Sequence, residues 1–227
     1  MYNSNYYEYR VQSIKHIINN RFMKLMMPIV IMLFAYFSNV EVIAQCQPGY
    51  TLRTDTISVN GCNYAINMCV KCAVGPAPGD VILMEFIKLG AGCLQTWNAQ
   101  QVLTYINNHI KTSNYLLMHL CLAPIPYPCP AQGPEYTFRY WLCFNIEKIS
   151  YFGEDHIVYR PCDYDNWCEE KYTYCYNPQT QKIEGTRTSG PTMVGSINCG
   201  LEAHMVPEPT EYDEPTECFI YHSPCNP

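Results

Sequence analysis

The sequence predicts a disulfide-rich secreted domain of the α+β class, built mainly of antiparallel β-hairpins with one principal helix. Three observations support this prediction. Fourteen cysteines occur in 227 residues, and all of them lie at or after position 46. Runs of alternating apolar and polar residues recur between turn signals, as half-buried strands do. One stretch, beginning at position 98, has apolar residues at helical spacing instead.

The first 44 residues have the order of a secretory signal peptide. Arg21 and Lys24 precede an uncharged apolar run at 25–37. A small-residue cleavage pattern follows and ends at Ala44. As a helix this run would span about 20 Å, whereas a bilayer core is about 30 Å thick. We therefore expect cleavage after Ala44, with a retained anchor as the alternative. Met23 directly precedes the basic flank, so we predict that translation starts there.

The cysteines predict an oxidised framework. An even count combined with an export signal points to disulfides formed outside the cytoplasm. A lipid on Cys46 is the alternative, but it would leave an odd number, and Gln45 is not the small residue that such a site requires. The residues expected in disulfides are Cys46, Cys62, Cys69, Cys72, Cys93, Cys121, Cys129, Cys143, Cys162, Cys168, Cys175, Cys199, Cys218 and Cys225.

Cys69 and Cys72 form a CxxC motif that closes a predicted strand. In an extended strand their Cα atoms would lie about 10 Å apart, beyond the roughly 7 Å that a disulfide spans. We therefore predict two bridges to separate partners. A redox pair and half of a zinc site are the alternatives.

The part at 45–122 is predicted to contain a hairpin, a strand and the principal helix. Asn60-Gly61 favours a two-residue type I′ turn because both residues tolerate positive φ, and this turn places Val59 opposite Cys62. A short apolar run at 81–89 predicts a buried strand.

The helix begins at Asn98, an N-cap residue whose reciprocal partner is Gln101. A second short helix is predicted at 115–121. The apolar stripe of the first helix consists of Ala99, Leu103, Ile106 and Ile110.

A proline-rich link at 123–135, expected to be structureless, precedes a β-rich part at 136–200. Its elements are a strand at 136–146, a returning strand at 156–160, a hairpin of 169–176 with 182–188, and a short strand at 193–199. Asn177-Pro178 starts the turn of that hairpin. The remainder, 201–227, is an acidic, proline-rich tail that Cys218 and Cys225 should fasten.

Charge and motifs argue against several functions. Acidic residues outnumber basic ones 20 to 14, which disfavours nucleic acid as a partner. The sequence contains no HExxH, GxSxG or P-loop motif, so it predicts neither a cofactor nor a metal. The loop starting at Asp163 departs from a calcium loop, with Cys168 and Tyr174 where Gly and Glu belong. The pairs Glu154-Asp155 and Glu169-Glu170 are expected on the solvated surface.

Aromatic residues provide the candidate binding site. Tyr172, Tyr174 and Tyr176 share one face of a predicted strand, and Trp167 lies shortly before them. An exposed row of this kind stacks on sugars or binds a protein partner. The alternative, which we favour, is cross-strand packing over a thin core. Solvent exposure of the three tyrosines would support the binding interpretation.

Taken together, these features favour an exported, non-catalytic protein with a structural or binding role, located outside the cell, in the periplasm or at the cell surface. Its partner would be a protein or a glycan, with no membrane contact after the signal is removed. The alternative is a secreted hydrolase that gathers carboxylates from separate loops. It would require a deep pocket holding two carboxylates with shifted pKa values.

Overall fold

The structure, a computed structural model, describes residues 46–90, 93, 97–124, 126–129, 133–151, 153–197, 199–212 and 214–226. The predicted signal segment at 1–44 and the predicted start at Met23 lie outside the described residues. The strands in the described part are β1 (Thr51–Val59), β2 (Cys62–Lys71), β3 (Gly79–Leu89), β4 (Glu135–Trp141), β5 (Cys143–Tyr151), β6 (Glu154–Pro161), β7 (Trp167–Asn177), β8 (Lys182–Val194), β9 (Leu201–Glu202) and β10 (Phe219–Ile220). The helices are α2 (Ala99–Ile110), the π-helix η1 (Asn114–Leu120) and the 3₁₀-helix η2 (Ala203–Met205).

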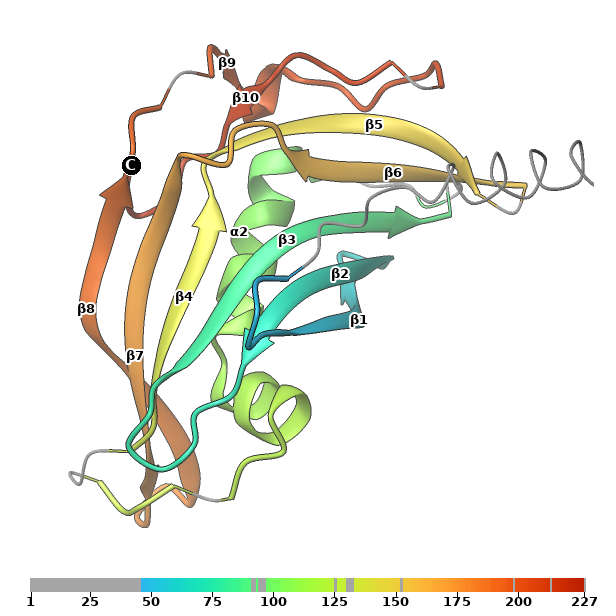
Figure 1. The fold of residues 1–227 in the computed structure, drawn as a ribbon. Coiled ribbons are helices and arrows are strands. Elements are labelled where there is room, and N and C mark those ends of the chain that lie inside the picture. Colours follow the sequence, from blue (N-terminus) through green and yellow to red (C-terminus); the bar gives the residue numbers. More distant parts are fainter. Residues whose placement is uncertain are drawn as a thin grey trace, which may run out of the picture. The chain divides into compact units, whose positions relative to one another are not determined.

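The strands form one sheet that branches at β3 (Figure 1). One edge of β3 pairs with β2 along its length. The other edge pairs in parallel with β4 over its first residues and antiparallel with β6 over its last ones. β7 and β8 extend the first branch, and β5, β10 and β9 extend the second. The α+β class and the disulfide content are confirmed, but the body of the fold is one sheet rather than a set of hairpins.

The first hairpin forms as predicted. Asn60 and Gly61 have φ values of 51° and 81°, which is the region that a type I′ turn requires. Val59 pairs with Cys62 in the predicted register. On β2, the residues of the predicted inner face are buried: Tyr64, Ile66, Met68 and Val70.

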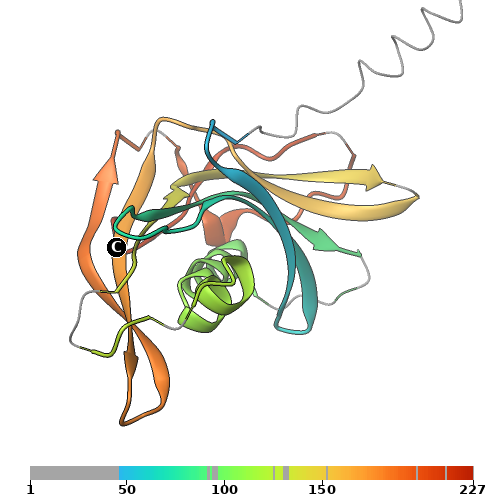
Figure 2. The ribbon, with the colours of Figure 1, turned by 60° about the horizontal axis from the view of Figure 1, so that its bottom comes forward.

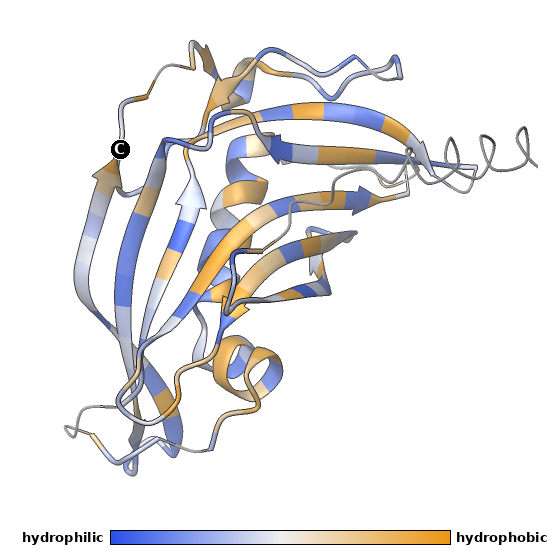
Figure 3. Cartoon of the chain, in the orientation of Figure 1, coloured by the Kyte–Doolittle hydropathy of each residue, from blue (hydrophilic) through white to orange (hydrophobic). Residues whose placement is uncertain are grey.

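α2 and η1 lie on the concave side of the sheet (Figure 2). Asn98 and Gln101 form the predicted capping box, in which each side chain binds the backbone N–H of the other residue. The predicted apolar stripe of α2 is buried, and η1 occupies the position of the second predicted helix. Apolar residues concentrate on β3, whereas β8 is largely polar and exposed (Figure 3).

The run at 136–146 was predicted as one strand, but it divides at Leu142 into β4 and β5. The predicted inner face stays buried across the break, because Tyr140, Leu142 and Phe144 are all buried; Cys143, predicted on the opposite face, is buried as well and is bonded to Cys199. The backbone of Leu142 is satisfied by other segments: its N–H donates to Asn166 O at 3.2 Å, and its carbonyl accepts from Tyr221 N at 2.8 Å. The chain therefore passes from one branch of the sheet to the other without losing its inner face.

Two further predictions are wrong in part. Of the strand predicted at 193–199, only Met193 and Val194 are in a strand, because β8 ends at Val194 and Gly195 takes a φ of 86°. A Cβ at Gly195 would lie 2.1 Å from Asp165 O, so the chain turns there at close approach to another loop. The proline-rich link is also not wholly structureless. Its residues Tyr127 and Cys129 exchange backbone hydrogen bonds with Tyr176 of β7.

All fourteen cysteines lie in the described part, and all of them are paired. The seven bridges join Cys46–Cys69, Cys62–Cys93, Cys72–Cys121, Cys129–Cys175, Cys143–Cys199, Cys162–Cys218 and Cys168–Cys225. The two cysteines of the CxxC motif have separate partners, as predicted. The last two bridges fasten the acidic tail at Cys218 and Cys225, which was also predicted.

Candidate binding pocket beside Tyr176

The three tyrosines of β7 share one face, but that face is turned toward the helices. Tyr174 is 0% exposed, and its hydroxyl donates to Lys111 O at 2.6 Å, directly after α2. Its ring meets Tyr136 edge-on, with the ring centroids 5.9 Å apart. The binding interpretation requires Tyr174 to be exposed, and this prediction is wrong because Tyr174 packs into the core.

Tyr172 and Trp167 are half-buried and lie away from Tyr176. Tyr172 packs edge-on against Phe138, and burial raises the pKa of its hydroxyl. Trp167 packs against Trp141 at the other end of β7. Nine residues of extended strand, about 30 Å, separate Trp167 from Tyr176, so the predicted row does not form one small site.

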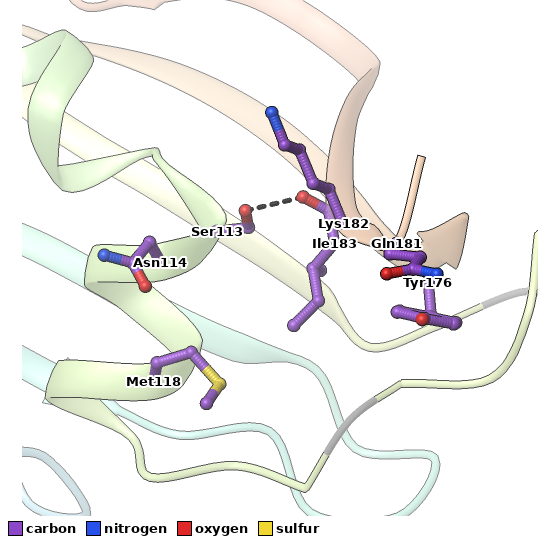
Figure 4. Close-up of a pocket in the computed structure, with 7 residues that line it drawn as sticks. All are labelled: Ser113, Asn114, Met118, Tyr176, Gln181, Lys182 and Ile183. Atoms are coloured by element: carbon purple, nitrogen blue, oxygen red, sulfur yellow. Dashed lines mark hydrogen bonds between the residues drawn. The ribbon is translucent and has the colours of Figure 1, made fainter. Parts of the chain in front are cut away.

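Tyr176 lines a pocket of about 370 Å³ between η1 and the β7–β8 hairpin (Figure 4). The wall of the pocket on the helical side consists of Ser113, Asn114 and Met118. Ser113 Oγ donates to Ile183 O at 2.7 Å and so ties the start of η1 to β8. The remaining lining residues come from the hairpin: Gln181, Lys182 and Ile183.

The lining of this pocket combines apolar walls with a polar rim. Met118, Tyr176 and Ile183 are the apolar side chains, while Lys182 brings an ammonium group. Asn114 and Gln181 add amides. An apolar group with a hydrogen-bond acceptor or a negative charge at one end suits such a lining. No carboxylate is among the residues that line this pocket, so it lacks the acid–base pair that the hydrolase alternative needs.

Two disulfides hold the pocket in shape. Cys121, bonded to Cys72, directly follows η1. Cys175, bonded to Cys129, directly precedes Tyr176. Because these bridges restrict both walls, little conformational entropy remains to be lost when a ligand enters.

Two carboxylates converge on Arg139 at another place in the sheet. Asp80 Oδ2 lies 2.9 Å from Arg139 Nη1, and Glu169 Oε2 lies 3.0 Å from Nε. Burial raises the pKa of Asp80, while the hydroxyl of Tyr50 and the charge of Arg139 oppose that rise. The guanidinium pairs with both acids at once, so this cluster is an ion-pair network of the sheet.

Glu170 was predicted on the solvated surface and is instead 1% exposed. It lies on the inner face of β7, where Lys111 Nζ donates to its Oε2 and Arg187 Nη1 lies 3.2 Å from its Oε1. Burial lowers the pKa of Lys111, and the carboxylate of Glu170 opposes that shift. The prediction failed because the partner that makes burial tolerable is distant in sequence.

α2 and η1 carry a row of aromatic rings that the sequence analysis missed, and it includes the buried Tyr115. Tyr105 stacks on His109, which packs against Tyr115, which in turn packs against His119. His119 Nε2 lies 2.8 Å from Asp55 Oδ2 on β1. The spacing of four residues within each helix was the available signal. Since neighbouring ring centroids lie only 4.7–5.8 Å apart, the rings of this row largely contact one another.

A metal site and a membrane-spanning helix find little support in the described ranges. Within them, no three His, Cys, Asp or Glu side chains are grouped so as to hold a metal ion. In the loop that starts at Asp163, the carboxylate of Asp163 accepts hydrogen bonds from the backbone N–H of Asp165 at 2.9 Å and from the Asn166 amide. No helix among the described residues has the length and apolarity to span a bilayer.

Comparisons with known proteins were made with protein-family models, curated sequences and solved structures, and none of them matches this chain.

Proposed function

We propose that this protein is exported and non-catalytic, and that it binds an apolar group of a protein partner in the pocket beside Tyr176. The observation that carries the proposal is the pocket itself, whose apolar walls are held by two disulfides. Seven disulfides are typical of a protein that folds in an oxidising compartment, which supports export.

The surroundings of the pocket favour a protein over a glycan. Met118, Leu122 and Tyr127 are 47%, 81% and 74% exposed, on η1 and on the segment that follows it. Leu122 has a φ of 47°, in the left-handed region that a non-glycine residue rarely adopts. Exposed apolar side chains next to an apolar pocket are typical of protein interfaces. Glycan sites instead offer flat rings with dense polar groups, whereas this pocket has a single ring, Tyr176, and its other apolar walls are the aliphatic side chains of Met118 and Ile183.

Export predicts a defined mature protein. N-terminal sequencing of the protein from the extracellular or periplasmic fraction should begin at Gln45. Peptide mass spectrometry without reduction should recover the seven bridges seen in the structure. A product that retains residues before Gln45, or that stays in the cytoplasm with free thiols, would contradict export.

The pocket predicts binding of small apolar probes. We expect N-acetyl-tryptophanamide, N-acetyl-leucinamide and the anionic dye anilinonaphthalene sulfonate to bind, as measured by calorimetry and dye fluorescence. Ile183→Asp should weaken binding about tenfold or more, because it places a charge in the apolar wall. Met193→Asp is the matched control, since Met193 is an exposed apolar residue on the same strand that does not line the pocket.

The outcomes separate the two kinds of partner. Binding of the amides and the dye that Ile183→Asp weakens and Met193→Asp preserves supports a protein partner. Binding of methyl glycosides without the amides would assign the pocket to a glycan and overturn the protein proposal. Failure of every probe, or equal effects of the two substitutions, would reject the pocket as a binding site.

A further inference from the structure

β1 is an outer strand of the sheet, because it pairs with β2 and with no other strand of the described part (Figure 1). Its nine residues pair with β2 without a register shift, and none of them is proline or glycine. β8, the other long outer strand, contains Pro191 and Gly190, and its pairing with β7 shifts register twice. Bulges and proline are devices that protect an edge from pairing, and β1 lacks them.

The groups on the open edge of β1 follow from its turn. Val59 and Cys62 flank a two-residue turn and therefore exchange both of their backbone hydrogen bonds. The backbone N–H and C=O groups of the odd-numbered residues of β1 consequently point toward β2. The N–H and C=O groups of the even-numbered residues point away from the sheet. In the described residues, the amides of Leu52 and Thr54 have no hydrogen-bond partner. The amide of Thr56 is bound only by the side chain of Asp55, at 2.8 Å.

The charges on β1 are self-complementary about Thr54. If two copies align antiparallel with a two-fold axis through Thr54, Arg53 of each lies opposite Asp55 of the other, and that Asp55 also keeps His119 Nε2 of its own chain 2.8 Å from its Oδ2. These are non-hydrogen-bonded positions, where opposing side chains approach most closely. Moving the axis by one residue places Arg53 opposite Arg53 or Asp55 opposite Asp55, and like charges repel. One register is therefore selected.

We propose that two copies of this protein associate through β1, antiparallel and with Thr54 on the two-fold axis. Leu52 then exchanges backbone hydrogen bonds with Thr56 of the other copy, and the Thr56 amide gives up its bond to Asp55. Arg53 is exposed and forms no ion pair within the described part of its own chain, so its charge is available. The isologous arrangement closes after two copies, which leaves no edge at the interface for further growth.

Sedimentation velocity of the exported protein over a wide concentration range tests this proposal. Arg53→Glu should raise the dimer dissociation constant about tenfold or more, because two attractive cross-strand pairs become repulsive. The double variant with Arg53→Asp and Asp55→Arg should restore the dimer by exchanging the two charges. Thr54→Pro should abolish it, since the amide it removes faces outward and makes no bond within the chain.

Amide hydrogen exchange provides a second measurement. The amides of Leu52, Thr54 and Thr56 should become protected as protein concentration rises, while those on the open edge of β8 should not. A protein that stays monomeric at every concentration would overturn the proposal. So would a dimer that Arg53→Glu and Thr54→Pro leave unchanged, because its interface would lie elsewhere.

Discussion

Glu170→Gln should destabilise the protein by about 3–5 kcal/mol, the range expected when one partner of a buried ion pair is removed. Glu170 is 1% exposed and is the carboxylate that neutralises Lys111, which is itself buried. With a neutral amide at position 170, the ammonium of Lys111 loses its counter-charge and keeps a neutral acceptor and the faces of two rings, with the Tyr140 centroid at 4.7 Å and the Tyr172 centroid at 6.0 Å. Urea unfolding followed by circular dichroism measures the loss.

The neighbouring residue provides the matched control. Glu169 pairs with Arg139 on the more exposed side of the same strand, so Glu169→Gln should cost no more than about 1 kcal/mol. The double variant Lys111→Met with Glu170→Leu should recover most of the stability, because apolar residues of similar size remove the need for a counter-charge. Arg187, which also contacts Glu170, is half exposed and remains solvated. Equal losses at Glu169 and Glu170 would contradict this account of the inner face.

Local signals in the sequence predicted the parts of the fold that depend on neighbouring residues. Asn60-Gly61 determines a turn by its own backbone preferences, and Asn98 with Gln101 caps a helix within one turn. The alternation at 136–146 predicted the buried inner face, although Cys143 on the opposite face is buried too. It could not reveal the break at Leu142, because the same face stays inward on both branches of the sheet.

The candidate site could not be predicted because its walls meet only in three dimensions. Ser113 and Ile183 are 70 residues apart, yet they share a hydrogen bond at the pocket. The tyrosine row was assigned to the correct strand face, but its exposure depended on where the helices pack. The hydroxyl of the buried Tyr174 donates its hydrogen bond to the backbone carbonyl of Lys111, which lies 63 residues earlier in the chain. Likewise, the cysteine count predicted full pairing, but the partners depend on the folded chain.

Complete reduction of the seven disulfides should abolish the native fold at room temperature. Each native bridge contributes about 2–4 kcal/mol by restricting the unfolded chain, so together they supply on the order of 20 kcal/mol. The net stability of a domain is only about 5–15 kcal/mol. The loops that the bridges close span 23 to 57 residues, and for loops of this length closure removes substantial conformational entropy from the unfolded chain. Near-ultraviolet circular dichroism should lose its tertiary signal after reduction and alkylation.

A single bridge should show the same effect on a smaller scale. Replacing Cys168 and Cys225 by Ala opens a 57-residue loop, and chain entropy assigns to it about 4 kcal/mol. The loss should exceed that from replacing Cys46 and Cys69, whose 23-residue loop corresponds to about 3 kcal/mol. The difference in stability loss between the two variants should be larger still, because Cys225 fastens the tail whose Phe219 and Tyr221 pack into the core. A fully reduced, alkylated protein that kept its native near-ultraviolet spectrum would show that the sheet and helices are sufficient alone, and that the bridges serve another purpose.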